Sequence, residues 1–324
     1  MPRPNRGDVH VHSLLGNLAV KVILGAHMFI SADVFPIVPV DKQSDNYVVY
    51  DKGDFLRDEA EERAPATESA GGNYDIDTSP YYTCRTFSFH KDVDDDTRDN
   101  ADKPIDPDRD AMQFAIQKLL IKRERQFLGN YLKAGVWSTN YTGIAGEPGA
   151  SQFKKWSASG SKPVKDIDVW MNAVEEQTGM RPNRLVISPD VMSALKDNAD
   201  IISRIQYTQR GIITPEILAS LFEVEKVLVA RGTYNTAPKG AATAMSRMAS
   251  GQVLLAYAAD RPSIENPSAG YLFAWKGRYG NSKLGSRIKK FRMEELKSDR
   301  VEAELSFDPK LVASDLAVYA SAVV

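Results

Sequence analysis

Residues 178–196 read Thr178-Gly-Met-Arg-Pro-Asn-Arg-Leu-Val-Ile-Ser-Pro-Asp-Val-Met-Ser-Ala-Leu-Lys196. Gly179 predicts the end of a helix, because glycine readily adopts the left-handed conformation that closes a last turn. The apolar residues 185–187 predict a short buried strand, and Ser188-Pro189 predicts the cap and first turn of a second helix. This unit of helix, turn, strand and helix contains no metal ligand or phosphate loop. It therefore indicates a structural element rather than a catalytic one.

The composition bounds the class of protein. The chain has 324 residues, enough for about two domains of ordinary size, and its hydrophobic content of 43% supports real cores. No apolar run reaches the ~18 residues that cross a bilayer, so we expect no membrane contact. The net charge of −2 excludes a strongly cationic nucleic-acid binder. Cys84 is the single cysteine, which excludes an intrachain disulfide, and we expect a soluble, intracellular protein without a cofactor.

Two predicted strands enclose a long polar segment. Residues 47–56 and 81–90 have the composition and alternation of strands, and residues 57–80 between them are rich in Glu, Ala, Gly and Asp. This pattern indicates a long projecting β-hairpin. Since a two-stranded ribbon is marginally stable alone, we expect it to rest against another subunit. Residues 35–40 contain two prolines and predict an extended segment.

A long helix is predicted after an acidic segment. Residues 92–110 hold nine aspartates against three basic residues, and we expect them to form a solvated loop. Asp106-Pro107 is a helix start signal, and the pattern continues to about Ala134, a length of about 40 Å. The expected core-facing residues are Met112, Ile116, Leu119, Leu120, Phe127 and Tyr131, and Lys122, Arg123, Glu124 and Arg125 are expected on a solvated or intersubunit face.

The remaining sequence predicts a mixture of short helices and strands. Residues 143–161 have the composition of a loop, and residues 276–292 carry seven Lys or Arg and no acid. Helices are predicted at 164–177 and 214–222, and residues 199–207 are expected to be helical or irregular. Strands are predicted at 224–230, 253–257, 271–275 and 300–307.

Three patterns invite a catalytic or metal-binding interpretation, and their spacing argues against each. Asp92, Asp94 and Asp96 match the start of a calcium loop, but a lysine stands where the bidentate glutamate is required. His10 and His12 lack a third ligand nearby. The glycines at 143, 146 and 149 fit neither a dinucleotide nor a phosphate loop. We therefore expect no metal site, no cofactor and no enzymatic activity.

Two segments of opposite charge are candidates for contacts between subunits. The tip of the predicted hairpin is acidic and residues 276–292 are basic. Both could be ordinary solvated loops, or their complementary charge could set the register of neighbouring subunits. The candidate assembly contacts are Asp58, Glu59, Glu61, Glu62, Arg63, Arg287, Lys289, Lys290 and Arg292.

Taken in order, residues 35–324 resemble a tailed-phage major capsid protein with the Hong Kong 97 capsid fold. Each matching segment consists of common residues, and it is their order and spacing that is specific. The segments that carry the resemblance are residues 35–42 with Tyr47 and Tyr50, 68–72, 97–102, 119–124, 178–207, 269–271 and 300–302.

The resemblance implies an α+β capsid fold with four parts. These are an N-terminal arm (1–40), an E-loop hairpin with its return (41–103), a P-domain with a spine helix (104–165, completed by about 276–310), and an A-domain (166–275 and 311–324). It also implies self-assembly into hexamers and pentamers of an icosahedral shell around double-stranded DNA. The protein would then occupy the virion capsid, after assembly in the host cytoplasm.

The resemblance implies partners as well. About 35 residues precede Phe35, and they do not resemble the long charged helical extension that serves some members as a built-in scaffold. We therefore expect a separate scaffolding protein, a portal, a decoration protein, and packaged DNA contacted non-specifically. The alternative is an encapsulin-like compartment shell of the same fold. A hydrolase or metal enzyme built on the acidic segment is a third class, which predicts loss of activity on chelation.

Overall fold

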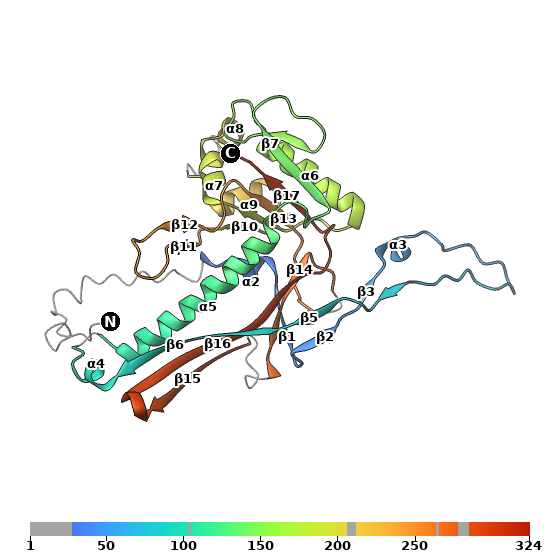
Figure 1. Cartoon of the computed structure of the whole chain (residues 1–324). Coiled ribbons are helices and arrows are strands. Elements are labelled where there is room, and N and C mark those ends of the chain that lie inside the picture. Colours follow the sequence, from blue (N-terminus) through green and yellow to red (C-terminus); the bar gives the residue numbers. More distant parts are fainter. Residues whose placement is uncertain (1–27, 103–104, 206–211, 264–265, 278–284) are drawn as a thin grey trace.

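The computed structural model describes residues 28–102, 105–205, 212–263, 266–277 and 285–324. It shows two sheets with their own helices and one long projection (Figure 1). His10, His12 and most of the expected N-terminal arm lie outside the described residues.

The first sheet runs along the long helix α5 (Figure 1). Its strands pair in the order β1-β14-β16-β15, and β6 pairs with the other edge of the long strand β16. All neighbours are antiparallel except β1 and β14. The members are β1 (Ile37–Val40), β6 (Arg85–Asp94), β14 (Gly270–Trp275), β15 (Ser286–Met293), β16 (Ser298–Leu311) and α5 (Pro107–Tyr131).

The second sheet has six strands in the order β10-β9-β13-β17-β7-β8. Its strands are β7 (Thr139–Ile144), β8 (Gln152–Lys154), β9 (Arg184–Ile187), β10 (Lys226–Val229), β13 (Val253–Ala256) and β17 (Ala317–Ser321). Its helices are α6 (Pro163–Thr178), α7 (Pro189–Asp197), α8 (Ala199–Ile205) and α9 (Pro215–Leu221). β7 and β8 fall within the range 104–165 that the sequence assigned to the P-domain.

Smaller elements connect these layers. Three two-stranded ribbons are formed by β2 with β5, β3 with β4, and β11 with β12. Their bounds are β2 (Ser44–Asn46), β5 (Tyr81–Thr83), β3 (Val49–Tyr50), β4 (Ile76–Asp77), β11 (Thr233–Asn235) and β12 (Met245–Arg247). Short helices are α2 (Ser31–Val34), α3 (Lys52–Phe55), α4 (Asp95–Asp99) and the 3-10 turn η4 (Glu294–Leu296).

The unit at 178–196 forms as predicted, with one correction. Gly179 has φ 70° at the end of α6, and all four residues of β9 are buried. Ser188 stands at the N-cap position of α7, but its hydroxyl makes no capping bond. The Ser188 Oγ instead accepts the backbone N–H of Gln252 at 3.2 Å. The hydroxyl therefore helps join β9 to the start of β13, and the predicted side-chain cap is wrong.

The predicted long helix is confirmed as α5, again with a correction. Asp106 caps it by accepting the N–H of Arg109 at 3.1 Å. Phe127 packs on Phe35 with ring centroids 4.9 Å apart, which joins α5 to the chain before β1. Glu124, expected on a solvated or intersubunit face, is fully buried within its own chain. Its carboxylate accepts the N–H groups of Ile30 and Ser31, both at 3.1 Å.

Several local predictions of strands and loops differ from the structure. The expected strand 47–56 is interrupted because Asp51 accepts the N–H of Gly53 and caps the single turn α3. The expected loop 143–161 contains β8 and the end of β7. For the basic segment the sequence left open a solvated loop or a subunit contact, and residues 286–292 of it lie in the strand β15. The expected acidic loop 92–110 is instead the end of β6, the turn α4 and the start of α5.

Candidate assembly interface

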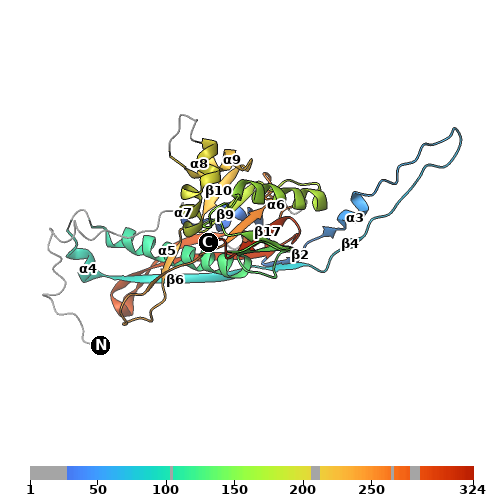
Figure 2. The ribbon, with the colours of Figure 1, turned by 90° about the horizontal axis from the view of Figure 1, so that it is seen from above.

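The segment between β3 and β4 projects away from both sheets, as both views show (Figures 1 and 2). Its limbs pair only at the base, where Val49 lies opposite Asp77 and Tyr50 opposite Ile76. Every residue from 55 to 79 is exposed. The projection is therefore a hairpin in outline, but two residue pairs provide its only strand pairing among the described residues.

An exposed aromatic cluster lies at the base of this projection. The rings of Tyr50, Phe55 and Tyr74 contact one another, with centroid distances of 5.4–5.8 Å. Phe55 and the adjacent Leu56 are 61% and 64% exposed. An exposed apolar group of this kind marks an interaction site more often than a free surface.

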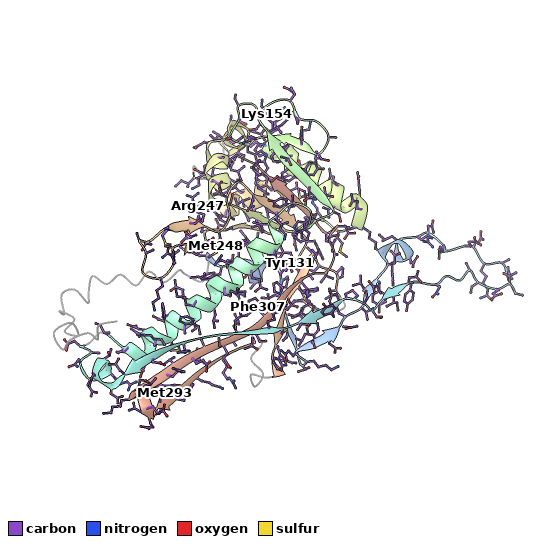
Figure 3. The ribbon with its side chains drawn as sticks, in the orientation of Figure 1. Tyr131, Lys154, Arg247, Met248, Met293 and Phe307 are labelled. Atoms are coloured by element: carbon purple, nitrogen blue, oxygen red, sulfur yellow. The ribbon has the colours of Figure 1, made fainter. Side chains whose placement is uncertain are left out.

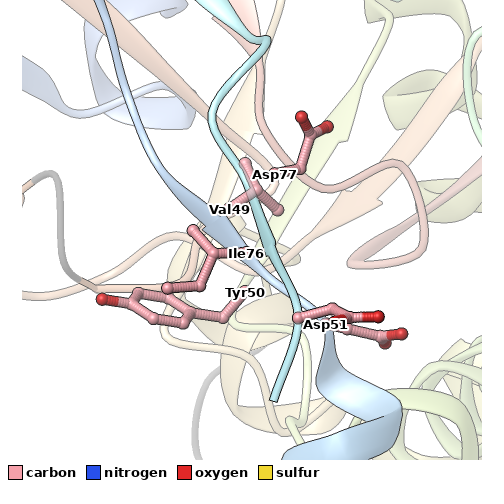
Figure 4. Close-up of a pocket in the computed structure, with 6 residues that line it drawn as sticks. Val49, Tyr50, Asp51, Ile76 and Asp77 are labelled. Carbon is pink, nitrogen blue, oxygen red and sulfur yellow. The ribbon is translucent and has the colours of Figure 1, made fainter.

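An open pocket lies beside the aromatic cluster, between β3 and β4 (Figure 4). Three apolar or aromatic residues and three aspartates line it: Val49, Tyr50, Asp51, Asp75, Ile76 and Asp77. Lys52, one residue beyond, forms an ion pair with Asp315. This pair fastens the base of the projection to the turn before β17, while the rest of the projection remains free of the body.

The acidic candidates all lie on the projection and are exposed. The Glu59 carboxylate pairs with Arg57 at 3.0 Å, and the Arg63 Nε donates to the Thr67 carbonyl at 2.6 Å. Asp58, Glu61 and Glu62 have no ion pair within the part of the chain that the structure describes. The sequence correctly indicated an exposed acidic tip.

The four basic candidates from residues 276–292 lie on β15, at the other end of the molecule (Figure 1). Three of them have carboxylate partners in their own chain. Arg287 binds Glu304 at 2.7 Å, Lys290 binds Asp108 at 2.5 Å, and Arg292 binds Asp95 at 2.6 Å. Lys289 is exposed and has no ion pair among the described residues. The structure does not bring the acidic and basic candidates together within one chain.

Carboxylates of the acidic segment 92–110 are partners of the cations on β15 and of Arg300 on β16. Hydrogen bonds from Arg300 lower the pKa of Asp92, and hydrogen bonds from Arg292 lower the pKa of Asp95. The same interactions raise the pKa of both guanidinium groups. Their bonds join α4 and β6 to the hairpin of β15 and β16. Of the nine aspartates in this run, Asp92, Asp95 and Asp108 therefore have basic partners, whereas others, such as Asp96 and Asp99, remain exposed.

The described residues contain no group of three His, Cys, Asp or Glu that could hold a metal ion. No helix in the described ranges is long and apolar enough to span a membrane. The sequence did not single out the aromatic cluster of this interface, and it did not indicate that Glu124 of α5 is buried. Three aromatic residues in an otherwise polar segment were the available signal for the first.

The family and sequence comparisons both match this chain to phage major capsid proteins. The model of the family described as phage major capsid protein E matches residues 150–257. A major capsid protein of Burkholderia phage BcepMu is 25% identical over 312 residues, covering 94% of each chain.

Among solved structures, a phage-related protein from Bordetella bronchiseptica aligns with a TM-score of 0.68 and 20% identity, over 93% of this chain and 94% of that one. The capsid of cyanophage P-SCSP1u aligns at 0.57 and 10%, over 94% and 91%. An encapsulin from Synechococcus elongatus aligns at 0.54 and 11%, over 97% and 96%.

These matches define the class first: the chain has the Hong Kong 97-like capsid fold, as the resemblance predicted. Within that class, it is a phage major capsid protein. The α+β fold class and the recognition of the family are thereby confirmed.

Proposed function

We propose that the chain assembles into hexamers and pentamers that close an icosahedral shell around the double-stranded DNA of a tailed phage. Its role is structural rather than catalytic, and its assembly takes place in the host cytoplasm. The expected partners are further copies of this chain, a separate scaffolding protein, a portal and a decoration protein. The four-part division into arm, E-loop, P-domain and A-domain belongs to this proposal.

One observation carries the proposal: the projection, residues 51–75 between β3 and β4, has no stable partner among the residues that the structure describes. Its strand pairing is limited to two residue pairs, and its aromatic cluster is exposed. A ribbon of this kind gains stability only by burying apolar surface elsewhere. A second copy is the natural occupant, because a shell presents the same neighbouring surface to every subunit.

The charge pairing between subunits remains part of the proposal in a narrower form. Lys289 is the basic candidate best suited to meet the acidic tip of a neighbour, because Arg287, Lys290 and Arg292 already bind carboxylates. We expect charge reversal at Glu59, Glu61 and Glu62 to impair assembly, with partial rescue by Lys289→Glu. Rescue by Lys226→Glu to the same degree would contradict this pairing.

An encapsulin-like compartment is the second candidate, supported by the structural match to an encapsulin over almost the whole chain. Nuclease-treated particles purified from the natural source distinguish the two. The phage capsid predicts protected DNA of uniform length inside closed shells. Particles that contain one cargo protein and no DNA would overturn the DNA-packaging role.

A further inference from the structure

A row of exposed cations lies along α5. Lys118, Lys122 and Arg125 are spaced by four and three residues, which places them on one face of the helix. Unlike three of the four cations of β15, none of them forms an ion pair with a described residue. Their charge is therefore not neutralised within the described chain.

Each cation of this row lies over an aromatic ring instead. The Lys118 Nζ is 5.1 Å from the ring centroid of Phe114, and the Lys122 Nζ is 5.5 Å from that of Phe87. The Arg125 guanidinium is 4.1 Å from the ring centroid of Tyr234. A ring orients a cation by its quadrupole and leaves the full positive charge available to an external anion.

The contact with Tyr234 joins the row to the ribbon of β11 and β12, which lies beside α5 (Figure 1). Residues 231–249 contain Arg231, Lys239 and Arg247 and no acid. All three are exposed, and Figure 3 shows Arg247 on this ribbon. The helix row and the ribbon together form one surface, which we call the α5–ribbon face.

Acidic groups are scarce on this face. Glu124 is the only acid between residues 111 and 146, and its buried carboxylate is occupied by the N–H groups of Ile30 and Ser31. Asp33 on α2 is exposed nearby and acts on Arg123, which is not part of the row. A chain of net charge −2 thus concentrates six cations on two adjoining elements.

We propose that the α5–ribbon face binds the phosphate backbone of double-stranded DNA without sequence preference, and is therefore the inner face of the shell. This inference rests on the proposed function. Lys118 and Arg125 stand seven positions apart, which is about 10 Å along the helix axis, so the row presents three cations over a length comparable to that of a few phosphates. A protein partner would instead require a desolvated apolar centre, whereas the rings of Phe87 and Tyr234 here lie under cations.

The test uses the purified, unassembled full chain and two duplexes of different sequence, each about 30 base pairs long. The first variant combines Lys118→Gln, Lys122→Gln and Arg125→Gln. The control combines Lys165→Gln, Lys196→Gln and Lys226→Gln, which removes three exposed cations beside the second sheet. Fluorescence anisotropy at several salt concentrations gives the affinity and its salt dependence.

We expect the native chain to bind both duplexes equally. The first variant should bind about 10-fold or more weakly at low salt, and its logarithmic salt slope should fall by about 2–3, since each phosphate contact contributes about 0.9. The control should change neither quantity. If the triple variant unfolds, Lys118→Gln and Lys122→Gln alone should each lower the slope by about 1.

Electron microscopy separates this inference from the proposed function. We expect the native chain and both triple variants to form shells. An unchanged affinity and slope in the first variant would overturn the inference, even if shells form. Loss of shells with unchanged DNA affinity would also overturn it, because the face would then bind a protein. Failure of the native chain to form shells would count against the proposed function, whereas the DNA measurement would still decide the inference.

Discussion

Gly270 illustrates how a single residue fixes the joint between α5 and the first sheet. A Cβ at this position would overlap the ring of Phe35 and come within 2.6 Å of the Lys310 carbonyl oxygen. Phe35 is fully buried between Phe127 and Tyr131, so its ring has no room to move. We expect Gly270→Ala to lower the free energy of unfolding by about 1–3 kcal/mol, measured by urea denaturation.

Gly129 is the matched control for that substitution. It lies in α5, is exposed, and has no atom within 4 Å of an added Cβ. Because alanine is favoured over glycine in a helix, Gly129→Ala should raise the free energy of unfolding by about 0.5–1 kcal/mol. A gain at position 270, or equal losses at both positions, would contradict the packing described for Phe35.

Glu124 is buried to serve two backbone donors of α2. Removing its carboxylate leaves the N–H groups of Ile30 and Ser31 buried without an acceptor. We expect Glu124→Ala to lower the free energy of unfolding by about 1–3 kcal/mol, whereas Glu176→Ala on the exposed side of α6 should change little. Thermal denaturation of the two variants tests this, and equal effects would contradict it.

At the scale of elements, the pairing of β6 with β16 includes an ion pair. Arg300 lies opposite Asp92 in the register, and their bonds lower the pKa of Asp92 below its ordinary value of 3.8. A carboxyl with a lowered pKa stabilises the fold above its ordinary pKa and loses that contribution as pH falls through the folded value. The destabilisation caused by Arg300→Gln should therefore be present at pH 6 and shrink below about pH 3.8. Unfolding curves at both pH values measure it, and a pH-independent difference would count against the pair.

The aromatic cluster of the projection should serve assembly rather than folding. Phe55 is largely exposed, so Phe55→Ser should leave the unfolding temperature of the subunit nearly unchanged and reduce the yield of shells. Phe55→Leu retains apolar surface and should assemble better than the serine variant. Sedimentation of assembly reactions measures the yield. Equal yields from the serine variant and the native chain would exclude the cluster from the interface.

Elements with strong local signals could be predicted from the sequence. Asp106-Pro107 marked the start of α5, and Gly179 marked the end of α6, because both act through the backbone of their own helix. The role of Glu124 could not be predicted, because the donors it serves lie 93 and 94 residues away. Periodicity places a side chain on a face of a helix, but it cannot show which distant donor needs an acceptor.

The candidate interface shows the same limit. Exposure of the acidic tip followed from its composition, but the partners of Arg287, Lys290 and Arg292 depend on the β15–β16 register and on α4 and α5. Composition also separated an acidic from a basic segment, yet three of the four basic candidates proved to be neutralised in their own chain. A row of cations without an ion pair among the described residues lies on α5, where the sequence predicted only a charged face.

At the scale of the whole molecule, the two sheets with their helices form a body that buries its own cores, whereas the projection does not. This division predicts that the body folds alone and the shell requires the projection. Deleting residues 57–72 removes the tip and keeps β3, β4 and α3. The deletion should therefore leave the thermal unfolding of the subunit nearly unchanged.

The most direct test is negative-stain electron microscopy of this deletion beside the native chain, each produced with the same scaffolding candidate. We predict closed shells of uniform size from the native chain, and only folded subunits or small oligomers from the deletion. Shells of normal size and yield from the deletion would contradict the claim that the projection joins neighbouring subunits.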